Sequence, residues 1–312
     1  MFKFILSLLV LTSINAQATP LSPETKDKLE KLRASVETWA PMCEGAMALD
    51  RKCYQFDMVE YAGYRCATGD LERCQDIKEA QDVDGRFWRA KRLIRKTAGN
   101  SFSRDMFMGL MFYFSKTKDV DSFQRWMAYL STHRHRMCDD ADDNRCKLQP
   151  SSWAMLGLLS QHLGLKQNLK MRLGRQELPG EMLITALTAP KGFELVLLAD
   201  NLYFLRSLGI NTSWMQRTAR IAYHRQPNNP MFKYLAEGST EELASLLMEA
   251  CPAEPSRLGD DIFWQRRLER NEKGELIVIR DWGVGRTNIP VNEMADGQDC
   301  LVALNLAIRS PL

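Results

Sequence analysis

Three carboxylates stand at the starts of strongly apolar segments. Asp105 precedes residues 106–114, which are all apolar or glycine, Asp299 precedes the apolar stretch that begins at Cys300, and Asp261 precedes "IFWQRR". A charge cannot accompany such a segment into a protein core without a strong partner. The pattern therefore makes these three acids candidates for general acid/base chemistry at the mouth of a cleft.

The residue that caps the helix decides what Asp105 can do. If Ser103 is the N-cap, Asp105 is the second helical residue, where the helix dipole favours a charged carboxylate and opposes the raised pKa of a general acid. A role as base, nucleophile or ligand then fits better. If Ser101 is the N-cap, burial could override the dipole. The structural alternative is that Asp105 pairs with an arginine or caps backbone amides, and a similar helix-start role is open to Asp299.

Cleavage of a glycosidic bond needs two carboxylates that flank the bond, together with groups that hold the sugar. Arginines can bind an acidic sugar, tryptophan faces can stack on sugar rings, and Asp200-Asn201 interrupts an apolar helical segment between Leu195 and Leu205. Taken alone, each tryptophan is more often a core residue than a sugar platform. The candidate binding residues are Arg104, Trp88, Trp126, Trp264, Asp200 and Asn201.

The first 18 residues have the pattern of a secretory signal peptide. "MFKFILSLLVLTSINAQA" contains one lysine, an apolar stretch and a final A-x-A cleavage signal. The apolar run is shorter than the roughly 20 residues that a membrane-spanning helix needs. We therefore expect an exported protein, periplasmic or secreted, without stable membrane insertion.

The charge balance argues against a dedicated nucleic-acid binder. The formal net charge is +3, and loss of Lys3 with the signal peptide leaves 3 − 1 = +2. A nucleic-acid-binding chain usually has a strong basic excess.

Eight cysteines remain after residue 18, and an even number in an exported chain indicates disulfides. Loop proximity predicts the first three pairs and elimination the fourth: Cys43–Cys53, Cys66–Cys74, Cys138–Cys146 and Cys251–Cys300. The alternative of a zinc site is weaker because no C-x-x-C spacing occurs. "CDDADDNRC" fails the calcium-loop pattern at Arg145 and Ser151. We expect no metal and no cofactor.

Signals for helix starts and ends occur along most of the chain. Ser22-Pro23 predicts a helix start. Ser101 or Ser103 can be the N-cap of one helix and Asp119 or Asp121 the N-cap of the next, and the short turn between them predicts that the two helices are antiparallel. Segments that are apolar on all sides alternate with amphipathic ones, which predicts inner helices covered by outer helices. We expect an all-α fold, either an α/α toroid or an irregular array of helical hairpins, with a small β-hairpin near the C-terminus at "ELIVIRDW". Residues 19–312 are expected to form a single domain with a cysteine-rich irregular part to about residue 85.

"GNSFSRDMFMGLMFYFSKTKD" and the later "RCKLQPSSWAMLG" resemble the inner-helix pattern of secreted α/α-toroid proteins akin to the six-hairpin glycosidases. The resemblance covers mainly residues 99–157. It implies a saccharide-cleaving cleft at one end of the ring, with acids at the inner-helix starts. We therefore expect a monomeric carbohydrate-active enzyme, a hydrolase or a lyase, that acts on a cell-envelope or extracellular polysaccharide. The alternative is a non-enzymatic exported helical protein that binds a glycan or a protein partner.

Overall fold

The computed structural model describes residues 20–40, 42–43, 46–47, 58–97, 101–138, 146–190, 192–254, 267–280, 287–290 and 297–309. Helices account for most of these residues. The helices are α1 (Pro23–Trp39), α2 (Met58–Ala67), α3 (Leu71–Glu79), the short 3-10 helix η1 (Lys91–Leu93), α4 (Arg104–Thr117), α5 (Val120–Thr132), α6 (Pro150–His162), α7 (Leu169–Thr188), α8 (Phe193–Ser207), α9 (Ser213–Arg225), α10 (Pro230–Glu237), α11 (Glu241–Ala250) and α13 (Gln298–Arg309). None of these described helices is both long enough and apolar enough to span a membrane.

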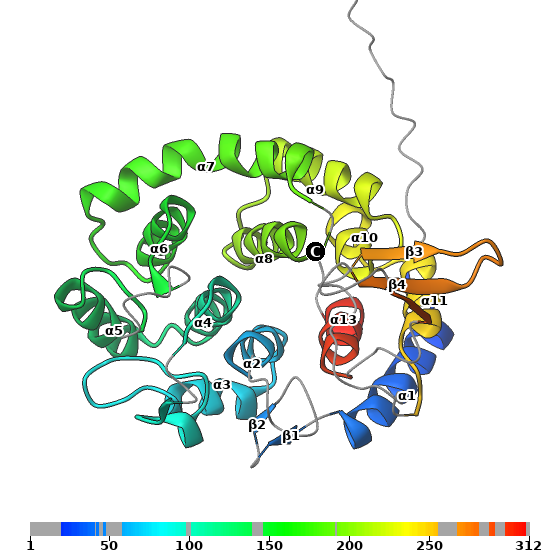
Figure 1. Cartoon of the computed structure of the whole chain (residues 1–312), viewed down its shortest axis with the longest axis horizontal. Coiled ribbons are helices and arrows are strands. Elements are labelled where there is room, and N and C mark those ends of the chain that lie inside the picture. Colours follow the sequence, from blue (N-terminus) through cyan, green and yellow to red (C-terminus); the bar gives the residue numbers. More distant parts are fainter. Residues whose placement is uncertain are drawn as a thin grey trace, which may run out of the picture.

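The helices are arranged in two layers. Helices α2, α4, α8 and α13 lie toward the middle, while α1, α5, α7 and α9 lie around the outside (Figure 1). The inner helices are buried almost throughout: α4 is buried from Asp105 to Ser115 and α13 from Gln298 to Ile308. Outer helix α1 buries only Leu29 and Val36. The expected all-α fold, with apolar helices inside amphipathic ones, is confirmed.

Local capping explains where the central helical hairpin begins and turns. Ser103 is the N-cap of α4, and Lys118 ends the helix in the left-handed conformation at φ 53°. Asp119 then caps α5, because its side chain accepts a hydrogen bond from the Ser122 N–H. Of the two caps considered for each helix, the structure uses Ser103 and Asp119.

Two glycines allow α2 and α4 to cross at backbone contact. A Cβ atom on Gly63 would collide with the backbone of Gly109, and one on Gly109 would collide with the Val59 carbonyl oxygen. Only glycine fits at this crossing, because any other residue would push the two helices apart. The crossing holds the polar residues of α2 close to those of α4.

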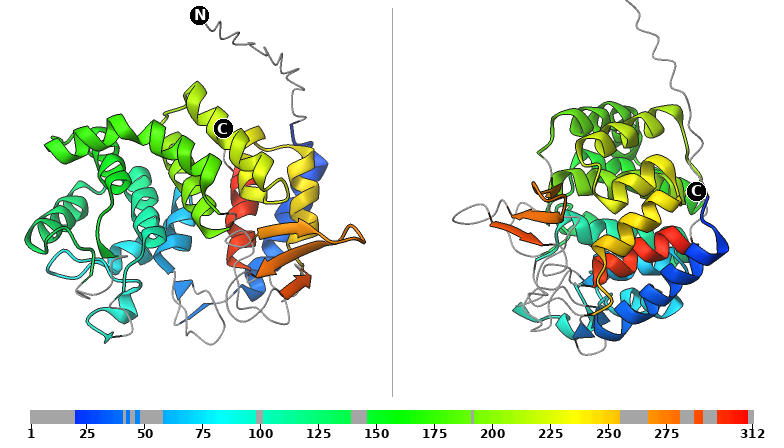
Figure 2. Two further views of the ribbon diagram at one scale, coloured as in Figure 1. Left: turned by 45° about the horizontal axis from the view of Figure 1, so that its top comes forward. Right: turned by 90° about the vertical axis from the view of Figure 1, so that its right-hand side faces the viewer.

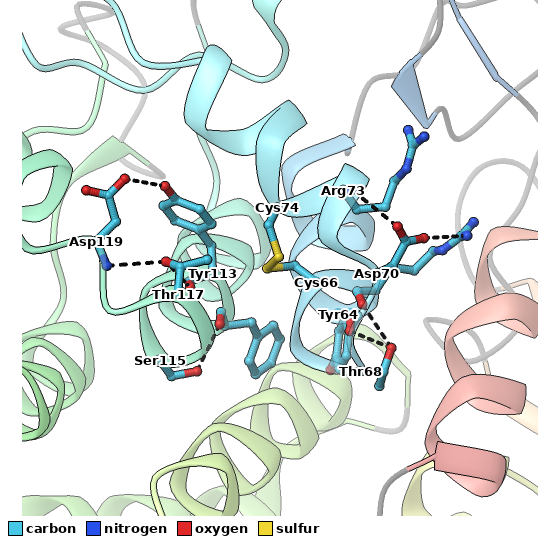
Figure 3. The surroundings of a disulfide bond; sticks show 12 residues. Tyr64, Cys66, Thr68, Asp70, Arg73, Cys74, Tyr113, Ser115, Thr117 and Asp119 are labelled. Atoms are coloured by element: carbon cyan, nitrogen blue, oxygen red, sulfur yellow. Dashed lines mark hydrogen bonds and ion pairs between the residues drawn. A yellow bond between two sulfur atoms is a disulfide. The ribbon is translucent and has the colours of Figure 1, made fainter.

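Three of the four expected disulfides are present: Cys66–Cys74, Cys138–Cys146 and Cys251–Cys300. Cys66–Cys74 joins α2 to α3 across a tight turn, where Asp70 caps α3 and pairs with Arg65 at 2.6 Å (Figure 3). The expected Cys43–Cys53 pair lies outside the described residues, since Cys53 is not among them.

The first and last described helices close the ring. Helix α1 packs against α13 and α11. Glu241, the first residue of α11, accepts hydrogen bonds from the Ser22 N–H at 2.6 Å and from the Thr25 hydroxyl at 2.7 Å. The Cys251–Cys300 disulfide joins the end of α11 to the first turn of α13.

A small antiparallel sheet lies at the edge of the helical body (Figure 2). It consists of β3 (Arg267–Arg270), β4 (Leu276–Arg280) and β5 (Thr287–Pro290), in the order β3-β4-β5. Strand β4 is the strand expected from "ELIVIRDW". Two further strands, β1 (Met42–Cys43) and β2 (Ala46–Met47), pair with each other near the N-terminus.

Candidate functional site

Asp105 is a buried carboxylate at the start of α4. Its side chain is 5% exposed. Its Oδ1 atom accepts a hydrogen bond from the Ser103 hydroxyl and another, at 2.9 Å, from the Met106 N–H. Within the described residues no arginine pairs with it. The carboxylate therefore accepts hydrogen bonds within the first turn of the helix. This is the structural role that the sequence left open as an alternative.

A second acid, Asp200 of α8, lies near Asp105 in the interior. The Tyr64 hydroxyl of α2 donates a hydrogen bond to Asp200 Oδ1. Burial raises the pKa of Asp200 to about 8, the negative charge of Asp105 adds to the rise, and the Tyr64 hydrogen bond partly opposes it. Burial and the charge of Asp200 also raise the pKa of the Tyr64 hydroxyl well above its ordinary value. Asp200 is therefore largely protonated at neutral pH, and we call Tyr64, Asp105 and Asp200 the buried acid cluster.

An open pocket lies beside this cluster, at the starts of α4, α6 and α8. Its polar lining comes from the first turns of these three helices, from Asn201 further along α8, and from the second half of α7. We call it the inner-helix pocket, and its polar residues are Arg104, Ser151, Ser152, Glu181, Thr185, Glu194 and Asn201.

Helix geometry explains why the pocket is lined by the neighbours of the buried acids. Residues three and four apart share a helix face, so Arg104, Phe107 and Met108 of α4 all line the pocket. Asp105 is turned about 100° away from that face. In α8, Leu197, Leu198 and Asn201 line the pocket, whereas Asp200 is turned toward Tyr64. The structure thus brings Arg104 and Asn201 to one pocket and places Asp105 and Asp200 behind it.

Of the other predicted residues that the structure describes, none lines this pocket. Asp299 is fully buried in the first turn of α13. Trp126 is 1% exposed and packs among Phe87, Phe107, Phe114 and Phe123, which makes it a core residue. The indole of Trp88 is almost fully buried, with the Arg86 guanidinium 3.7 Å from its ring centroid. Asp261 and Trp264 lie outside the described residues.

Two exposed glutamates in the pocket were not among the sequence candidates. Glu194 lies two residues after the N-cap Gly192, in the first turn of the apolar helix α8. It has the same pattern that singled out Asp105 and Asp299, so the sequence contained a signal for it. Glu181 lies on outer helix α7, where a charged residue is the normal solvent-facing choice, and nothing in the sequence distinguishes it.

No protein-family model, curated protein or solved structure matches this chain. The family resemblance inferred from the sequence therefore stays a prediction.

The buried acid cluster predicts an unusual dependence of stability on pH. Asp200 keeps its proton in the folded protein up to about pH 8, whereas in the unfolded chain an aspartate loses it near pH 3.9. The unfolded state then binds fewer protons than the native state between these values, so the stability contributed by this group falls as pH rises. The slope approaches about 1.4 kcal/mol per pH unit in the middle of the interval.

We expect Asp200→Asn to remove this part of the pH dependence. Asparagine is neutral at every pH and can still accept the Tyr64 hydrogen bond through its amide oxygen. Urea unfolding of both proteins at pH 5, 6, 7 and 8 measures the difference in slope. Exposed Asp121→Asn on α5 is the matched control and should give a curve parallel to the wild type. Parallel curves for Asp200→Asn as well would show that Asp200 is ionised in the native protein.

Proposed function

We propose that the chain is an exported carbohydrate-active enzyme that cleaves a cell-envelope or extracellular polysaccharide in the inner-helix pocket. The observation that supports this proposal is the composition of the pocket. Two exposed carboxylates, Glu181 and Glu194, share it with the exposed cation Arg104 and the amide Asn201.

This set of groups suits glycosidic bond cleavage by general acid/base catalysis. One carboxyl group protonates the departing oxygen, and the other attacks the sugar or activates a water molecule. Arg104 can bind a sugar carboxylate with charge-assisted hydrogen bonds, and Asn201 can bind sugar hydroxyls. The buried acid cluster acts in this scheme as the support that fixes the helix turns carrying Arg104 and Asn201.

Export is supported by two independent features. The first 18 residues have the pattern of a signal peptide. The three disulfides of the described residues are typical of proteins that fold in an oxidising compartment such as the periplasm.

The second candidate function is binding of a glycan without cleavage. It is favoured by the burial of Asp105 and Asp299, two of the three acids expected to act on the substrate, which are 5% and 0% exposed. The inner-helix pocket would then hold a saccharide through the same arginine, amide and carboxylates.

The test is made on the chain from residue 19 with a panel of neutral and uronic-acid polysaccharides. Reducing ends and unsaturated products are both measured, because they separate a hydrolase from a lyase. Glu194→Gln and Glu181→Gln should each lower kcat at least about 100-fold and leave glycan binding in place. Arg104→Gln should weaken binding of acidic glycans.

Glu177→Gln is the matched control for these variants. Glu177 is an exposed glutamate on α7, one turn before Glu181, and it does not line the pocket. Its activity should equal that of the wild type. Glycan binding by the wild type with no product from any polysaccharide would support the second candidate. An equal loss of activity in Glu177→Gln, Glu181→Gln and Glu194→Gln would contradict the assignment of the pocket.

A further inference from the structure

A second pocket lies toward the other ends of α6 and α8. It is lined by the last turns of these two helices, the middle of α7 and the start of α9, and its volume is about 550 Å³. The inner-helix pocket uses the first turns of α6 and α8, so the two pockets are separate sites. We call the second one the Trp214 pocket.

The walls of the Trp214 pocket are mostly apolar. Leu178, Leu205, Ile210 and the half-buried Trp214 contribute aliphatic and aromatic surface. A pocket of this volume, with apolar walls and a few polar groups, is typical of a small-molecule site. The apolar part of a ligand would cover surface that is otherwise in contact with water.

The polar side of the pocket is cationic and incompletely paired. Arg175 donates hydrogen bonds to two neutral oxygens, Gln161 Oε1 at 2.7 Å and Gln167 Oε1 at 3.4 Å, and no carboxylate among the described residues pairs with it. The guanidinium group of Arg175 is therefore a cation at the pocket without a carboxylate counter-ion in the described part of the chain.

We propose that the Trp214 pocket binds a small amphipathic anion, a carboxylate attached to an apolar body such as a medium-chain fatty acid. The carboxylate accepts hydrogen bonds from Arg175, and the apolar body lies against Leu178, Leu205 and Trp214. The carboxylate supplies the counter-ion that Arg175 lacks among the described residues. This inference does not depend on the function of the inner-helix pocket.

Isothermal titration calorimetry of the chain from residue 19 tests the proposal with three probes: octanoate, 1-octanol, which lacks the charge, and acetate, which lacks the apolar body. We expect octanoate to bind measurably more tightly than the other two. Arg175→Gln should weaken octanoate binding about tenfold or more, because a charge-assisted hydrogen bond is lost. The melting temperature of unliganded Arg175→Gln shows whether this variant is folded.

Arg172→Gln is the matched control, since Arg172 is exposed on α7 and does not line the pocket. Its affinity for octanoate should equal that of the wild type. Octanol binding as tight as octanoate, or unchanged octanoate binding by Arg175→Gln, would overturn the anion site. Octanoate binding no tighter than that of acetate would overturn the apolar part of the site.

Discussion

Gly109→Ala is expected to destabilise the protein by at least about 3 kcal/mol. The new methyl group would lie inside the van der Waals radius of the Val59 carbonyl oxygen and against the backbone at Glu60. These are backbone atoms within helix α2, so they cannot turn aside as a flexible side chain can. Relief requires the two helices to separate, which opens the most tightly packed crossing in the described core.

Urea unfolding measures this effect, and the chain provides a control for it. Gly180 also lies inside a helix, α7, but a Cβ atom there meets nothing within 4 Å. Gly180→Ala should therefore stabilise the protein by about 0.5–1 kcal/mol through helix propensity alone. Gly63→Ala should resemble Gly109→Ala, and the double variant should lose less than the sum, because both changes open the same contact. A loss below about 1 kcal/mol for Gly109→Ala would contradict the helix crossing.

Removal of the Cys251–Cys300 disulfide is expected to cost about 4 kcal/mol. The bond joins residues 49 positions apart, so its loss frees a long loop in the unfolded chain. The Cys66–Cys74 bond joins residues 8 positions apart, and its loss should cost about 2.5 kcal/mol.

Double Cys→Ala variants of each pair, unfolded in urea without reductant, provide the comparison. Alanine is used because Cys251, Cys300 and Cys66 are all buried and a serine hydroxyl would add its own cost. The larger loss should belong to the pair that closes the long loop. An equal or smaller loss for Cys251–Cys300 would contradict this loop-length account of the two bonds.

Local signals predicted the helices and the disulfides well. Ser22 before Pro23 marked the start of α1, and close spacing marked Cys66–Cys74 and Cys138–Cys146. Both depend on residues near one another in the chain. A β-hairpin was expected at β4, but the residues of its partner strands were not predicted. Strands β3 and β5 are short and carry polar residues that alternate no more clearly than a loop does.

The sequence could not predict how the candidate residues at the start of α4 are oriented. Arg104 and Asp105 were both chosen, yet the charged pair divides between the pocket and the interior. That division depends on how α4 is rotated about its axis, which packing against α2 and α8 determines. Trp126 was chosen as a binding residue but lies in the core, for a related reason. The sequence around an indole on an outer helix is the same whether the ring faces a ligand or, as here, four phenylalanine rings. Glu181 could be found only once α7 had been folded onto α8.

The contact of α1 with α13 also governs the order in which the chain can fold. During synthesis α1 and α2 are made early and α13 is made late. Helix α13 packs against both α1 and α2, so their apolar faces have no partner until nearly the whole chain has been made. Contacts between residues so far apart in the chain make folding slow and leave apolar surface open to aggregation while it proceeds. A closed ring of this kind cannot mature by adding one finished helical hairpin to the next, as an open stack of repeats can. In the export that we propose for this chain, late completion would keep the incomplete ring unfolded during transport.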